Sequence, residues 1–319
     1  MSSKSSDYVA PDTAALLALS LESGFYGVST YMFAETMKEL LFGGKFNRRM
    51  AIVASLFFVL STAHVIIDII RIKIGFIDQR DIFEGGPAAY FSQTLPLFSV
   101  RSSIYVAQTL LADAVVVYRC YMVWYPVVRW IVVVPLSLWL GLLVTSVGAL
   151  YNLGVASASG GGAEIFAFGK WIDGFFAMSL TTNLVGTGLL AYRIWKINQS
   201  SSEFQSKGIM VPVFRVVIDA GILYSIVLII TLAFFEARSN MQTILIDMLM
   251  PIISISFYMI IIRMSALSGR GGALGTEISF QLTTHSFNLS WAASEPHSTD
   301  YRGSSSFPGP RTGSKLEDG

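Results

Sequence analysis

The stretch VRSSIYVAQTLLADAVVVYRCYMVW (100–124) is long and apolar enough to cross a lipid bilayer, yet Asp113 stands near its centre. A carboxylate at that depth is costly, so its side chain is expected to point into protein and not at lipid. The stretch therefore predicts a bundle in which further helices surround it. Steps of about three or four residues place several polar side chains on the same helical face: Ser102, Tyr105, Thr109, Asp113 and Cys120.

The composition is that of a membrane protein. Hydrophobic residues make up 53% of the chain and charged residues 13%, whereas soluble domains average about 25% charged residues. The net charge of +1 gives no reason to expect nucleic acid as a partner. A single cysteine, Cys120, excludes a disulfide within the chain. The partner that the composition favours is the lipid bilayer.

Seven segments have the length of about 20 apolar residues that a membrane-spanning helix needs. They predict an all-α integral membrane protein, with a seven-helix bundle over 14–264 and a short outer tail over 1–13. The segment 265–319 is rich in Ser, Gly, Thr and Pro, and is predicted to be a disordered cytosolic tail. The predicted spans are 14–37, 50–71, 100–124, 130–152, 171–195, 213–236 and 241–263.

The distribution of Lys and Arg predicts the orientation of the bundle. With the N-terminus outside, more basic residues lie at the inward-facing ends of the spans than at the outward-facing ends, as the positive-inside rule requires. Arg71 and Lys73 are exceptions, because they lie at an outer end. We expect a plasma-membrane protein with its N-terminus outside and its C-terminus in the cytosol.

Polar side chains recur at helical spacing in the other spans, and their depths form two layers. Near the outer side lie Glu22, His64, Asp68, Arg101 and Asp247. Near the midplane lie Asp113 and Asn183, and below them lie Arg119, Arg193, Arg215 and Asp219. The candidates for ligand binding or a polar core are Glu22, His64, Asp68, Tyr105, Asp113, Asn183 and Asp247.

Two interpretations fit these layers. In the first, a water-accessible outer cavity ends at Asp113 and serves as a ligand pocket or as the start of a proton path, while Arg119, Arg215 and Asp219 couple it to the cytosol. In the second, the same side chains hydrogen-bond to one another and hold the bundle together. Boundary arginines such as Arg119 then reach lipid phosphates and set the topology.

Small residues recur every four positions along 130–152, at Ser137, Gly141, Thr145 and Ala149. Such a ridge lets two helices approach closely. It predicts either packing on 100–124 within the chain or a homodimer through Ser137, Gly141 and Thr145. The segment has no charged residue beyond Arg129, so it is predicted to be a peripheral helix.

No enzymatic motif is found. The last span has no lysine for a retinal Schiff base, and His64 is the one histidine inside a predicted span, too few for a hydrolytic zinc site. No nucleophile elbow, intramembrane pair of catalytic aspartates or phosphate-binding glycine loop is present. We therefore expect neither an enzyme nor a cofactor or metal.

Four stretches carry a family resemblance: STAHVIIDIIRI (61–72), LLADAVVVYRCYMVW (110–124), TTNLVGTGLLAYRIWKI (181–197) and IDMLMPIISISFYMIIIR (246–263). They resemble the uncharacterised multi-pass membrane proteins of mushroom-forming fungi, which implies seven helices over about 14–265. A looser similarity to G-protein-coupled receptors rests on Arg119 at the end of the third span and on Pro251 and Tyr258 in the seventh.

The sequence leads to one working hypothesis and two alternatives. The hypothesis is a receptor-like membrane protein that senses a small ligand from the outer side and signals through 196–214 and the tail. The alternatives are a proton-coupled transporter, for which His64 and the acids would exchange protons, and a structural or assembly protein. A cytosolic signalling protein is a further expected partner of the receptor.

Overall fold

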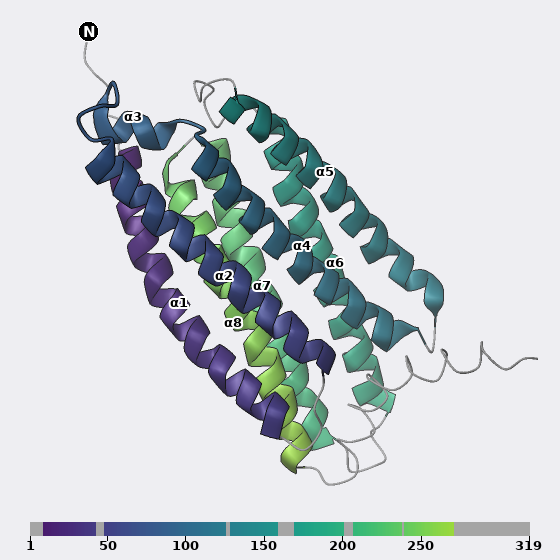
Figure 1. Cartoon of the computed structure of the whole chain (residues 1–319). Helices are drawn as coiled ribbons and strands as arrows, with labels where there is room; N and C mark the ends of the chain where they lie inside the picture. The colour runs from purple at the N-terminus through teal and green to yellow at the C-terminus, as the bar shows by residue number, and fades with distance from the viewer. Residues whose placement is uncertain are drawn as a thin grey trace, which may run out of the picture. The chain divides into compact units, whose positions relative to one another are not determined.

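The computed structural model describes residues 9–42, 48–125, 128–158, 169–200, 207–237 and 239–270, and these contain helices but no strand. The long helices run side by side in Figure 1. Their order is α1 (Pro11–Phe42), α2 (Arg48–Lys73), the π-helix η1 (Ile74–Asp78), α3 (Gly86–Ser92), α4 (Pro96–Trp124), the 3₁₀ helix η2 (Arg129–Val132), α5 (Val133–Ala158), α6 (Gly169–Ser200), α7 (Lys207–Glu236) and α8 (Met241–Arg270).

Five of the helical segments are long and apolar enough to cross a membrane, which indicates an all-helical, multi-pass membrane protein. In α7 the described apolar part, Gly221–Glu236, is shorter, and α1 is interrupted by Glu22 and Glu35. For these two helices spanning remains a prediction. The five are Arg48–Asp78, Pro96–Trp124, Trp130–Ala158, Gly169–Arg193 and Met241–Arg263.

Most helices extend beyond the predicted spans, because those bounds followed hydropathy alone and a helix backbone continues into polar residues. The last helix, α8, runs to Arg270 and so passes the predicted boundary at 264. The first helix begins at Pro11, where proline suits the first turn. The rest of the predicted C-terminal tail, from 271 onward, lies outside the described residues.

The helix α8 is the most enclosed of the five candidate spans. In its most apolar window 72% of the residues are buried, against 22% in α5. Around α8 lie α1, α2, α4 and α7, while α5 contacts α4 and α6 at the edge of the bundle. The prediction that 130–152 forms a peripheral helix agrees with this arrangement (Figure 1).

The small-residue ridge of α5 packs mainly against α6. A Cβ atom added at Gly141 would collide with Met178, and one added at Gly148 would collide with the Trp171 ring. The prediction that the ridge packs on 100–124, now α4, is therefore wrong, because the ridge faces α6. Helix α5 does contact α4 elsewhere: the Trp139 indole nitrogen donates to the Leu110 carbonyl at 3.1 Å.

The same packing bears on the predicted homodimer. Thr145 lies against Gly174 of α6, and Gly141 is covered by α6 as well, so Ser137 is the exposed member of the predicted interface. The ridge is thus used within the chain.

The connection between α2 and α4 packs onto α1. Tyr90 and Phe91 of α3 form a small buried cluster with Ala15 of α1. Positive φ angles at Gly85 and Gly86, +90° and +66°, let the chain turn sharply into α3. Figure 1 shows α3 lying across the end of the bundle where α1 begins.

We predict that Gly148→Leu lowers the free energy of unfolding by about 1–3 kcal/mol, because the Trp171 ring must move out of a packed interface. The matched control is Gly154→Leu in the same helix, where an added Cβ has no atom within 4 Å. Unfolding in detergent, followed by circular dichroism, measures both. Equal stability of the two variants would contradict the α5–α6 packing described here.

Candidate functional site

Charged and titratable side chains from four helices meet in the interior, and we call this group the charge cluster. Its members are 0–4% exposed: Glu22 of α1, His64 and Asp68 of α2, Arg101 of α4 and Asp247 of α8. On α2 the histidine and the aspartate are four residues apart, so they lie on one helical face.

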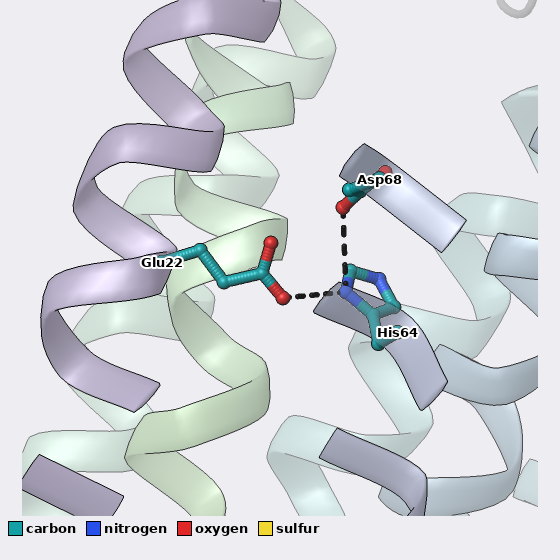
Figure 2. Close-up of side chains that lie close together, drawn as sticks. All are labelled: Glu22, His64 and Asp68. Carbon is teal, nitrogen blue, oxygen red and sulfur yellow. Dashed lines mark hydrogen bonds and ion pairs between the residues drawn. The ribbon is translucent and has the colours of Figure 1, made fainter. Parts of the chain in front are cut away.

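His64 lies between two carboxylates. Its Nδ1 atom is 2.6 Å from Glu22 Oε1 and 3.4 Å from Asp68 Oδ2, as Figure 2 shows. Because Glu22 comes from α1 and the other two from α2, this contact joins the first two helices. A single Nδ1–H could donate to both carboxylates.

Arg101 joins the second and last helices. Its Nε atom is 2.9 Å from Asp68 Oδ1, and its terminal nitrogen donates to Asp247 Oδ1. One turn along α2, Arg71 is buried too, with its guanidinium carbon 5.1 Å and 5.2 Å from the ring centres of Phe91 and Phe98. The guanidinium of Arg101 is thus shared by two carboxylates on different helices.

Two atoms of the charge cluster are left without a hydrogen-bond partner among the described residues. They are Glu22 Oε2 and His64 Nε2, and both are fully buried. Buried polar atoms in folded proteins nearly always have a partner, so each unpaired one calls for an explanation.

A neutral polar layer follows the charge cluster along the bundle. Gln108 of α4 donates through Nε2 to the Met250 carbonyl at 2.7 Å, and Ser61 donates to Gln108 Oε1 at 3.3 Å. The Ser61 and Ser254 hydroxyls are 3.0 Å apart. Gln108 is not among the residues predicted from the sequence, although it follows Arg101 by seven residues and so lies on the same helical face.

Asp113 lies beyond this layer and is 1% exposed. Ser179 of α6 donates to Asp113 Oδ2 at 2.9 Å, and the Tyr224 hydroxyl of α7 lies 3.0 Å from Ser179. The second carboxylate oxygen, Oδ1, has no hydrogen-bond partner among the described residues. Tyr105, eight residues before Asp113 on α4, is buried with its ring against Phe175.

A cavity of about 80 Å³ adjoins Asp113. It is lined by residues of α2, α4, α6, α7 and α8, most of them apolar, with Asp113 and Arg119 both in its wall. The Arg119 guanidinium carbon lies 5.3 Å from the Phe257 ring centre, and Asn183 donates to the Gly221 carbonyl at 3.1 Å. We call this space the Asp113 cavity.

The predicted site residues thus divide between two places. The structure brings Glu22, His64, Asp68 and Asp247 together in the charge cluster, and it places Asp113, Asn183 and Arg119 around the Asp113 cavity. The sequence hypothesis of an outer cavity ending at Asp113 differs from this arrangement, because the cavity lies on the Arg119 side of Asp113. The side chains of Arg215 and Asp219 lie outside the described residues.

The fold and site define a multi-pass helical membrane protein with a buried charge cluster and a separate, mostly apolar cavity beside Asp113. Comparison with protein-family models, with curated proteins and with solved structures finds no match.

We predict that Arg101→Met destabilises the fold by about 3–5 kcal/mol, because it leaves Asp68 and Asp247 buried without their shared cation. Arg80→Met is the control: Arg80 is exposed, and such a change alters stability by about 0.5 kcal/mol or less.

A double-mutant cycle checks the cause of this loss. Adding Asp247→Asn to Arg101→Met removes one of the stranded charges and is expected to recover part of the lost stability. If the double variant is less stable than Arg101→Met by the full effect of Asp247→Asn alone, the two residues are not coupled.

Proposed function

We propose that this chain is a seven-helix, receptor-like membrane protein that holds a small ligand in the Asp113 cavity. With the N-terminus outside, as the Lys and Arg distribution favours, the cavity lies in the half of the bilayer nearer the cytosol. The proposed ligand site is therefore in the inner half of the bilayer, whereas the sequence predicts it in the outer half. We assign the chain to the plasma membrane, within the fungal seven-helix family that it resembles.

The observation that carries this proposal is the unpaired oxygen of Asp113. A buried carboxylate is stabilised by a cation or by strong hydrogen-bond donors, and the described residues offer Oδ1 neither. A ligand ammonium group would supply both the charge and the donors. The apolar lining, with Phe57, Phe257 and Tyr224, would hold the rest of the molecule.

Arg119 favours a ligand with a second polar end. It stands six residues after Asp113 on α4, which corresponds to about 9 Å along a helix axis. Opposite charges therefore stand toward the two ends of one cavity. This pattern suits a small dipolar molecule, with its amine at Asp113 and an acidic or polar group at Arg119.

Ligand binding in the cavity would move helices relative to one another, because five helices line it. The charge cluster holds α1, α2, α4 and α8 together at the other end, so the movement would be confined to the cavity end. A ligand that draws α4 toward α6 and α7 changes the relative positions of the helix ends beyond Arg119. We propose that a cytosolic signalling protein reads this change at 196–214 and the tail.

A carrier is the second candidate, and one observation favours it. The bundle is closed by the charge cluster on one side of Asp113 and hollow on the other, as expected for one state of a transporter with a site near the midplane. In that case the charge cluster opens in the opposite state, and the Asp113 cavity then closes.

The test screens purified protein against small amines and amino acids, each paired with its N-acetyl derivative, by thermal unfolding. We expect a molecule with a free amine to raise the unfolding temperature while its acetylated partner does not; a ligand at 100 times its Kd stabilises by about 2.7 kcal/mol. Asp113→Asn abolishes the shift. Asp78→Asn, a change at an exposed aspartate, retains it.

Two results contradict the proposal: no shift with any amine, or an equal shift in Asp113→Asn. With a confirmed ligand, uptake of its radiolabelled form into proteoliposomes separates the two candidates. A receptor gives no uptake above empty liposomes, whereas a carrier gives uptake that Asp113→Asn abolishes.

A further inference from the structure

We propose that Glu22, His64 and Asp68 bind one divalent transition-metal ion, and we call these three residues the α1–α2 triad. A metal was not expected from the sequence, because a single histidine lies inside a predicted span. The site is distinct from the Asp113 cavity and does not depend on the function proposed for it.

The three donor atoms already lie close to one another. One possible ligand atom from each of the three residues lies within 4.8 Å of the other two. His64 Nδ1 is 2.6 Å from Glu22 Oε1 and 3.4 Å from Asp68 Oδ2. Ligand atoms about 2.0–2.2 Å from a tetrahedral Zn²⁺ stand about 3.3–3.6 Å apart. Small side-chain rotations would therefore admit the ion, and Figure 2 shows the three groups turned toward one another.

The unpaired oxygen of Glu22 points to a missing ligand. Oε2 is fully buried, and no donor among the described residues reaches it. The contact with His64 uses the other oxygen, Oε1. A metal ion bound by both carboxylate oxygens would satisfy Oε2, which hydrogen bonding to His64 alone does not.

The charge balance supports a cation. The charge cluster contains three carboxylates, of Glu22, Asp68 and Asp247, and one guanidinium, that of Arg101. Its formal charge is therefore −2 if the imidazole is neutral. A divalent ion brings this charge to zero. If Arg71 is counted as well, one proton on His64 is enough to neutralise the group, and the experiment below must separate a metal from a proton.

The surrounding residues suit a metal ligand set. Arg101 Nε holds Asp68 at 2.9 Å, and carboxylates that bind metals are commonly held by such outer contacts. One imidazole nitrogen with carboxylate oxygens suits Zn²⁺ and its first-row neighbours better than Ca²⁺ or Mg²⁺, which prefer oxygen alone. Because all three residues are buried, the ion would act as a structural link between α1 and α2.

The test uses the full-length chain, purified with an affinity tag that contains no histidine, incubated with Zn²⁺ and then freed of unbound ion. Elemental analysis is expected to give one zinc per folded chain. His64→Gln is expected to lose it. The matched control replaces His285 and His297 together with Gln and is expected to keep it, since these are the other two histidines of the chain.

X-ray absorption on the zinc-loaded wild-type protein identifies the ligands without any variant. We expect one imidazole and oxygen atoms at about 2.0–2.2 Å. Arg101→Lys, which keeps the charge but changes the contact with Asp68, is expected to weaken zinc binding by about 10- to 100-fold.

Folded wild-type protein that binds no zinc, manganese, iron or nickel overturns the proposal. So does a zinc ion without an imidazole ligand, or zinc retained by folded His64→Gln. A further contrary result would come from nitrogen NMR of metal-free wild-type protein. If His64 shows the shifts of an imidazolium and these do not change on adding Zn²⁺, a proton occupies the site and the metal proposal is overturned.

Discussion

The bundle depends on the ion pairs that the Arg101 guanidinium makes with Asp68 and Asp247. Taking one carboxylate out of water costs several kcal/mol, and the attraction to this shared cation offsets the cost for both aspartates. Because these residues lie on α2, α4 and α8, the three helices must approach at one level. Glu22 then brings α1 to the same place through His64. The order of helices at this end follows from pairing buried charge.

The bundle differs between its two ends for a physical reason. At the end of the charge cluster, the ion pairs of Arg101 hold α2, α4 and α8 together, and the contact between Glu22 and His64 adds α1. The layer around Gln108 continues this with hydrogen bonds. Beyond Asp113 the contacts between α4 and α8 are mostly apolar and leave a cavity. Apolar contacts lack the directionality of ion pairs, so changes in helix separation cost least at the cavity end.

The sequence predicts helices and faces better than neighbours. Length and hydropathy located the five described spans, and the spacing of His64 and Asp68 placed them on one face of α2. The pairing of Arg101 with Asp247, 146 residues apart, could not be predicted, because periodicity does not say which helices are adjacent. For the same reason Gly141 was assigned to the wrong neighbour. The side on which the cavity lies depends on how Phe57, Phe257 and Gly221 fill space, which no pattern encodes.

Both polar centres share one property: each has a buried carboxylate oxygen, Glu22 Oε2 or Asp113 Oδ1, without a hydrogen-bond partner among the described residues. In the charge cluster Arg101 pairs with Asp68 and Asp247, whereas Glu22 contacts His64. Asp113 has a hydroxyl partner, Ser179, but no cationic one within the described part of the chain. A bundle selected only for stability would gain from replacing such groups with apolar ones. Their presence in the interior is explained if each centre receives positive charge from outside the chain. A metal ion at the α1–α2 triad and an amine in the Asp113 cavity would each supply that charge.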